Sequence, residues 1–142
     1  MDFIESRLLG IQVDESGREA VLTFVDKAGS HFSLELHGLE RLLVSELRQQ
    51  NVVEEVIHWT KGVATSELRQ AAFALMAGVS EEVCDPTMAR VVHDTLDRVA
   101  RGESELLEIT AIFGAQILAL FASMTLRDRV TVLSVDDGTF GT

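Results

Sequence analysis

Hydrophobic and polar residues alternate in three short runs along the first part of the chain. The apolar positions of the three runs are Leu9, Ile11 and Val13; Ala20, Leu22 and Phe24; and Phe32, Leu34 and Leu36. In each run these residues share one face, and the residues between them are mostly polar. A period of two residues is typical of a strand that is buried on one side only. The pattern therefore predicts three strands.

Two similar turn sequences separate these runs. Each turn begins with an aspartate, Asp14 or Asp26, and has a glycine three positions later, Gly17 or Gly29. An aspartate can hydrogen-bond to its own backbone in a turn, and a glycine can take a positive φ. This chemistry is typical of a type I turn closed by a glycine bulge, which joins antiparallel neighbours. We therefore predict a three-stranded antiparallel meander with a positive φ at both glycines.

The next two segments are less regular. The leucines of residues 38–50 have helical spacing, although Leu42 and Val44 would also fit a strand. We favour a short helix for this segment and keep the strand as the alternative. Residues 51–59 are rich in valine and isoleucine, and they predict a fourth strand.

Two later segments have the 3.6-residue period of amphipathic helices. Residues 66–77 begin at the candidate cap Ser66 and end before Gly78. Residues 86–101 begin after the candidate cap Asp85, with a proline at the first helical position. On the exposed side of this second helix we expect two ion pairs, Asp94 with Arg98 and Asp97 with Arg101.

The longest uncharged stretch of the chain covers residues 109–126. Eighteen residues are the lower limit for a helix that crosses a membrane. The stretch is only moderately apolar, however, and residues 108–110 at its start resemble a strand. We therefore predict a buried core helix of about a dozen residues. Membrane insertion of residues 109–126 stays as the minor alternative.

Small residues recur at every fourth position of this uncharged stretch. They are Ala111, Ala115, Ala119 and Ser123. On a helix, side chains of this size let another backbone approach closely. The stripe is therefore a candidate close-packing surface or homodimer contact, with Ala115 and Ala119 buried.

Together these elements predict an α+β fold with one domain. An N-terminal antiparallel meander of three to four strands precedes two to three helices that pack on one of its faces. Residues 130–135 could add a late strand to the sheet. The predicted domain covers residues 1–135, and residues 136–142 are predicted to form a flexible tail.

The composition narrows the functional classes. The chain has 142 residues, of which 46% are hydrophobic, so disorder of most of the chain is excluded. Its 12 basic and 23 acidic residues give a net charge of −11. Such a chain repels nucleic acids and attracts basic proteins. The single cysteine, Cys84, and the absence of a secretory signal favour the cytoplasm.

We find no motif that carries catalysis or cofactor binding. The chain has no nucleophile–base signature, no clustered metal ligands and no glycine-rich phosphate loop, so we predict no catalytic residue, metal or cofactor. Four residues have no evident structural role: His37, His58, Trp59 and Cys84. They are candidates for a pocket between the sheet and the helices.

These observations leave three functional hypotheses. The first is a small acidic cytoplasmic protein that binds a basic partner protein, for example an inhibitor or an immunity-type protein that blocks a cationic toxin. Trp59 and Phe140 are candidate anchors for this contact. The second is a small-ligand-binding protein or enzyme that uses the pocket. The third is an oligomeric assembly module that forms homodimers through the uncharged helix.

Overall fold

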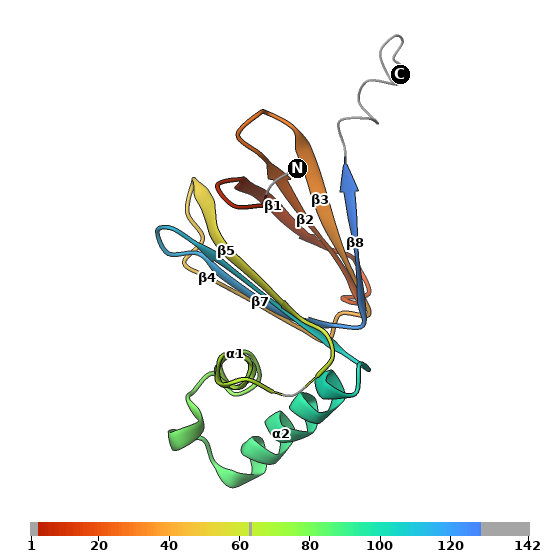
Figure 1. Cartoon of the computed structure of the whole chain (residues 1–142), viewed down its shortest axis with the longest axis vertical. Coiled ribbons are helices and arrows are strands. Elements are labelled where there is room, and N and C mark those ends of the chain that lie inside the picture. Colours follow the sequence, from red (N-terminus) through yellow and green to blue (C-terminus); the bar gives the residue numbers. More distant parts are fainter. Residues whose placement is uncertain (1–2, 63, 129–142) are drawn as a thin grey trace.

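The chain folds around one sheet of eight strands, in which all neighbouring strands are antiparallel (Figure 1). The computed structural model describes residues 3–62 and 64–128. The strands are β1 (Arg7–Val13), β2 (Glu19–Val25), β3 (His31–His37), β4 (Arg41–Ser45), β5 (Asn51–Trp59), β6 (Glu105–Ala111), β7 (Gln116–Phe121) and β8 (Ser123–Asp128). Between β5 and β6 lie α1 (Ser66–Met76), the 3-10 turn η1 (Glu81–Val83) and α2 (Pro86–Ala100). The order across the sheet is β4-β7-β6-β5-β1-β2-β3-β8.

The two predicted hairpins are confirmed. β1 pairs with β2, and β2 pairs with β3, in antiparallel register. The N–H group of Gly17 donates to the Asp14 carbonyl and that of Gly29 to the Asp26 carbonyl, both at 3.0 Å. The two glycines have φ values of +76° and +87°. The predicted strand over residues 51–59 is also confirmed as β5.

The predicted fold class is wrong, because the described residues form eight strands and two α-helices. The sequence led us to expect three to four strands followed by two to three helices. The difference lies in two segments. Residues 38–50 contain the strand β4 in place of the predicted helix, and residues 109–126 run through the end of β6, β7 and most of β8.

The position of β7 explains why the uncharged stretch resembled a core helix. Residues 117–121 are all buried, with at most 1% of each residue exposed. Ile117, Ala119 and Phe121 belong to one hydrophobic cluster, while Leu118 and Leu120 belong to the other. A strand that is covered on both faces needs an apolar residue at every position, so the period of two disappears.

The sheet is divided into two halves that face each other, with the helices as a third layer (Figure 1). One half consists of β1, β2, β3 and β8, and the other of β4, β5, β6 and β7. Between the halves lies a cluster that includes Phe24, Phe32, Ile109 and Phe121. On the outer face of the second half, α1 and α2 cover a second cluster of buried residues.

Two connections carry the chain from one half to the other. The first joins β3 to β4 through residues 38–40, where Gly38 has a φ of +66°. The second joins β7 directly to β8 through Ala122. The Ala122 N–H group donates to the His37 carbonyl at 2.9 Å, so the two connections lie against each other. The remaining link is the pairing of β1 with β5, which has only two register positions, Arg7 with Val52 and Leu8 with Asn51.

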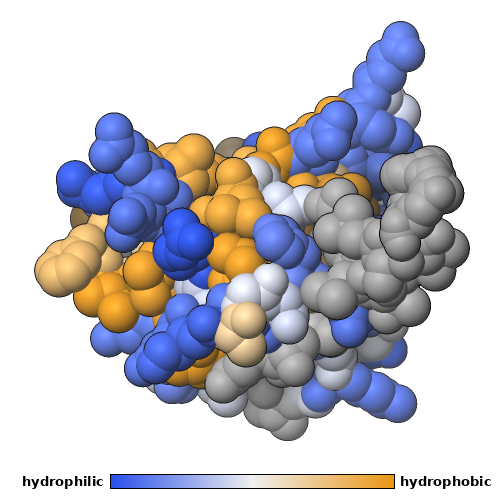
Figure 2. All heavy atoms as spheres, turned by 90° about the horizontal axis from the view of Figure 1, so that it is seen from above, coloured by the Kyte–Doolittle hydropathy of each residue, from blue (hydrophilic) through white to orange (hydrophobic). Residues whose placement is uncertain are grey.

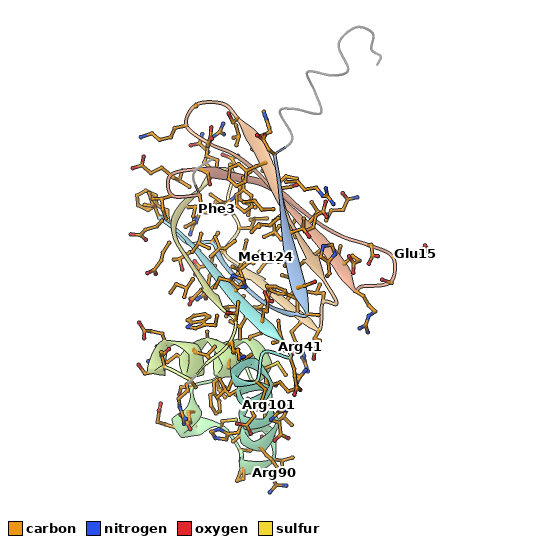
Figure 3. The ribbon with its side chains drawn as sticks, turned by 45° about the vertical axis from the view of Figure 1, so that its right-hand side comes forward. Phe3, Glu15, Arg41, Arg90, Arg101 and Met124 are labelled. Atoms are coloured by element: carbon orange, nitrogen blue, oxygen red, sulfur yellow. The ribbon has the colours of Figure 1, made fainter. Side chains whose placement is uncertain are left out.

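Phe3 closes one end of the space between the halves. Its ring contacts the rings of Phe24 and Phe32 edge-on, with centroid distances of 5.4 Å and 5.0 Å. Figure 3 shows Phe3 near the upper end of the sheet and Arg41 at the opposite end, next to the helices. The first cluster is therefore covered by an N-terminal side chain at the end that is far from α2.

Both predicted helices are confirmed, with small changes at their ends. Thr65 caps α1 in place of Ser66, because its Oγ1 accepts the Leu68 N–H group at 3.1 Å. Asp85 caps α2 as expected and accepts the Met88 N–H group at 2.9 Å. Neither α1 nor α2 has the length and apolar content that a membrane-spanning helix requires.

The basic residues at the end of α2 form different ion pairs from the predicted ones. Arg98 pairs with Glu40 at 2.9 Å, and Arg101 pairs with Glu103 at 2.7 Å. The first of these pairs connects α2 to the β3–β4 connection. The strand predicted over residues 130–135, the tail predicted over residues 136–142 and Phe140 all lie outside the described residues.

Candidate functional site

The structure places the four predicted pocket residues in separate surroundings. His37 lies on β3, where its Nδ1 is 2.6 Å from Glu19 Oε1 and its Nε2 is 3.0 Å from Thr125 Oγ1. The hydrogen bond from His37, together with one from the Gly38 N–H group, lowers the pKa of Glu19. His58 lies on β5, in the other half of the sheet, with its Nε2 2.7 Å from Glu105 Oε1. Each histidine therefore already has a partner within its own half of the sheet.

Trp59 and Cys84 both pack against the cluster between the sheet and the helices. His58, the neighbour of Trp59, instead stacks near Phe121 of the other cluster, because successive residues of a strand point to opposite faces. Desolvation by burial raises the pKa of the Cys84 thiol, and the charges of Asp85 and Glu81 raise it further. This thiol is therefore poorly suited to act as a nucleophile. The structure brings Trp59 and Cys84 to one cluster but not the two histidines.

The small-residue stripe does not exist as a surface, because the helix that would have carried it is absent. Ala111 belongs to β6, Ala115 precedes β7, Ala119 lies within β7 and Ser123 begins β8. Ala115 and Ala119 are buried, as predicted, and Ala111 is buried as well, but Ser123 is exposed. Within residues 3–62 and 64–128, no group of three His, Cys, Asp or Glu residues is placed to hold a metal ion.

A group of exposed apolar side chains lies at the end of the sheet that is far from the helices. We call it the apolar end and define it by four side chains: Leu9 (49% exposed), Leu47 (57%), Ile112 (47%) and Phe113 (78%). Leu9 and Leu47 line the same small hollow. Figure 2 looks onto this end and shows apolar atoms gathered at the left and centre, between hydrophilic groups.

The tight turn between β6 and β7 directs Ile112 and Phe113 outward. The Ala111 N–H group donates to the Ala115 carbonyl at 2.8 Å and closes the turn. The Ile112 N–H group donates to the Val52 carbonyl at 2.9 Å, which fixes the turn beside the start of β5. Gly114 has a φ of +110° and approaches Arg48 so closely that a Cβ atom there would lie 2.8 Å from the Arg48 Nε. The turn and the β4–β5 loop are thus packed together.

Charged residues surround the apolar end. Glu5 and Glu46 are already engaged, by Lys27 at 2.5 Å and by Arg48 at 3.6 Å. Glu54 and Glu55, at the start of β5 opposite the end of β6, are exposed and form no ion pair with the described residues. Arg7 of β1 also lies near the apolar end, and it forms no ion pair with the described residues. The free charge around the apolar end is therefore slightly negative, within a chain whose net charge is −11.

A groove of about 820 Å³ lies beside α1. Its walls are Leu43 of β4, one face of α1, and residues 78–82, which form the loop after α1 and the start of η1. Inside it, Arg69 Nη2 is 2.5 Å from Glu81 Oε2, and His93 Nε2 is 3.7 Å from the same oxygen. The edge of the His93 ring also faces Phe73, with a centroid distance of 5.8 Å. None of the four predicted pocket residues lines this groove.

Comparison with protein-family models, curated proteins and solved structures finds no match to this chain. The apolar end and the groove are therefore the two surfaces of this chain that point to a function.

The sequence reasoning missed both surfaces, although each has a local signal. Gly114 interrupts a run of apolar residues, and an isolated glycine between two strand-length runs is a turn signal. A turn at Gly114 would have placed Phe113 on the surface. The strand alternative for residues 38–50 would likewise have revealed β4 and the position of Leu43.

Proposed function

We propose that this protein binds a basic partner protein through the apolar end. The observation that carries the proposal is the exposure of Leu9, Leu47, Ile112 and Phe113 together, with Phe113 as the most exposed of the four. Large apolar patches that are surrounded by charged residues are typical of protein interfaces. Phe113 is the anchor, because aromatic side chains that enter a partner's pocket contribute most of the binding energy.

The net charge determines what kind of partner fits. A charge of −11 on a chain of this size attracts a basic protein over long range and accelerates the encounter, and salt slows it. An inhibitor or immunity-type protein that covers the basic surface of a toxin is one role of this kind. We place this role in the cytoplasm, where Cys84, a single cysteine without an intramolecular disulfide partner, stays reduced.

The small-ligand hypothesis has less support. Its four residues do not converge, since His37 and His58 lie in different halves of the sheet and each contacts a carboxylate there. The assembly hypothesis also loses its basis, because it depended on a helix that the chain does not form.

The test compares the wild-type protein with Phe113→Ser and with a matched control, Val13→Ser. Val13 is also exposed, at 45%, but lies at the other end of β1, away from the apolar end. Each protein is used to capture partners at low salt, and the captured protein is then purified for association kinetics. Thermal melts confirm that both variants are folded.

We expect Phe113→Ser to weaken binding about 30-fold or more, which is the effect of losing a central anchor. Val13→Ser should bind like the wild type. The association rate should fall as ionic strength rises, while the dissociation rate changes little. A neutral or acidic partner, or equal binding by Phe113→Ser and the wild type, would contradict the proposal.

A further inference from the structure

β4 is an edge strand whose outer side is open. In the described part of the chain its only hydrogen-bonded neighbour is β7. Alternate residues of an edge strand point their N–H and C=O groups away from the sheet, where another strand can pair with them. Between Arg41 and Ser45 the strand has three apolar residues, no proline, and a regular register without a bulge. Its only charged residue is the exposed Arg41 at its start, so apart from this residue and its shortness β4 lacks the features that usually block an edge.

The other edge strand, β8, differs in this respect. It ends with Arg127 and Asp128, and Arg127 forms an ion pair with Glu35 of β3. Charged side chains of this kind protect an edge against pairing. β4 is therefore the better candidate for a strand that accepts an additional one.

The groove beside α1 lies next to β4, because Leu43 is one of its walls. A peptide that pairs with an edge strand directs every second side chain to the same face of the sheet. On the side of the helices, these side chains would meet Leu43 and Val79, which are 39% and 42% exposed. Paired main-chain groups would supply affinity, and the groove would select the side chains.

The charges in the groove favour a basic occupant. Glu81 is engaged by Arg69, whereas Glu82 is exposed and forms no ion pair with the described residues. A second copy of the chain is a poor occupant, because two chains of net charge −11 repel each other. A segment that carries lysine or arginine can neutralise Glu82.

We infer that an extended basic segment of the partner adds to β4 as a further strand and places alternate side chains in the groove. The inference rests on the proposed function, because it assigns a second contact to the same partner. The two surfaces are connected through the chain, since Glu46 and Leu47 directly follow β4. From Leu43 to Leu47 an extended segment covers about 13 Å, at 3.3 Å per residue. One segment can therefore contact both the groove and the apolar end.

The test uses synthetic peptides of alternating lysine and valine, eight residues long, with blocked ends and a fluorescent label. Two further peptides carry N-methyl groups on every second backbone nitrogen, one peptide at the odd positions and the other at the even positions. Only the N–H groups on one side of an extended peptide can donate to β4, so only one of the two peptides loses these donors. Both methylated peptides keep the charge of the parent peptide. A glutamate–valine peptide tests the charge preference. Binding to the full chain is measured by fluorescence anisotropy.

We expect the lysine–valine peptide to bind and one N-methylated peptide to bind at least tenfold more weakly, with the other unchanged. The glutamate–valine peptide should not bind. Equal binding of the two N-methylated peptides would show that only charge attracts the peptide, and it would overturn the inference. Failure of the lysine–valine peptide to bind would overturn it as well.

Protein variants locate the site. Leu43→Lys should weaken peptide binding at least tenfold, and Glu82→Gln about threefold, whereas the matched control Leu126→Lys on β8 should have no effect. Leu126 is 46% exposed, close to the 39% of Leu43, so the two substitutions are comparable. A loss with Leu126→Lys but not with Leu43→Lys would assign the peptide to β8 and contradict the inference.

Phe113→Ser separates this inference from the proposed function. If Phe113→Ser retains the partner while Leu43→Lys loses the peptide, the apolar end is not the contact and the β4 site stands. If Phe113→Ser loses the partner and the N-methylated peptides bind equally, the proposed function stands and the β4 site is refuted.

Discussion

Gly38 lies directly against Ala122, at the place where both connections pass from one half of the sheet to the other. A Cβ atom at Gly38 would lie 2.8 Å from the Cβ of Ala122, which is closer than carbon atoms pack. Gly38 also has a φ of +66°, in the region that L side chains avoid. Two independent reasons therefore favour glycine at this position.

The first prediction follows from this contact. Gly38→Ala should lower the free energy of unfolding by about 2–4 kcal/mol, because backbone strain and overpacking act together. Gly17→Ala should cost only about 1–2 kcal/mol, since Gly17 has a similar φ of +76° but no atom near its Cβ position. Urea unfolding measures both. The double variant Gly38→Ala/Ala122→Gly should recover the overpacking part, and equal costs for the two single variants would contradict the contact.

The second prediction concerns Ala119, which is fully buried between the two halves of the sheet. Ala119→Leu should overpack this cluster and lower the free energy of unfolding by about 1–3 kcal/mol. Ala28→Leu, in the exposed β2–β3 turn, should change it by less than about 0.5 kcal/mol. Size-exclusion chromatography should show the same oligomeric state for both variants. A dissociated dimer without a loss of stability would instead support the small-residue contact.

The third prediction concerns the link between α2 and the β3–β4 connection. Arg98 Nη1 donates to Glu40 Oε2 at 2.9 Å and to Ser104 Oγ at 3.1 Å, and Ser104 is buried. The hydrogen bond with Glu40 raises the pKa of Arg98. Arg98→Ala should cost about 1–2 kcal/mol, because it removes two hydrogen bonds of a partly buried guanidinium, one of them to the buried Ser104.

Arg101→Ala is the matched control for this link. The pair of Arg101 with Glu103 is more than half exposed on both sides, so its loss should cost less than about 0.5 kcal/mol. Thermal or urea unfolding of the two variants measures the difference. Equal costs would show that Arg98 contributes no more than a surface ion pair.

The fourth prediction concerns acid stability. The hydrogen bonds from His37 and from the Gly38 N–H group hold the pKa of Glu19 below its ordinary value of 4.5. The folded chain therefore binds fewer protons at this site than the unfolded chain, and stability decreases as the pH falls below about 4.5. Melting temperatures between about pH 6 and about pH 3 should fall less steeply for Glu19→Gln than for the wild type.

Glu15→Gln is the control for the loss of stability at acid pH. Glu15 lies on the exposed β1–β2 turn and has no hydrogen bond or ion pair within the described part of the chain. Its substitution should leave the slope of the pH profile unchanged. The same slope for Glu19→Gln would mean that the His37 hydrogen bond does not act on stability.

The elements that the sequence predicted correctly are those whose signals are local. The turns at Asp14 and Asp26, and the cap at Asp85, depend on residues within a few positions of each other, so they can be recognised in isolation. β4 and β7 were missed because their structure depends on partners far along the chain. β4 pairs with β7, and residues 117–121 of β7 are all apolar because the first half of the sheet covers one face and the two helices cover the other.

The candidate site illustrates the same limit. An apolar side chain in a sequence carries no mark that distinguishes a core position from an exposed one. Phe113 and Phe121 lie in the same uncharged stretch, yet Phe121 is fully buried and Phe113 is 78% exposed. The turn at Gly114 makes the difference: in the sequence it is indicated only by an isolated glycine, and the pairing of β6 with β7 establishes it.

The pairing of distant strands has a consequence for the order of folding. The β1–β2–β3 meander can form as soon as it leaves the ribosome, but the second edge of β3 stays unpaired until β8 is synthesised, and β4 stays unpaired until β7 is synthesised. Until then both halves present unpaired edges that can capture other nascent chains. Contacts between such distant segments also make folding slow. A chain that is truncated after β6 would keep these edges permanently open, and we expect it to aggregate where the full chain folds.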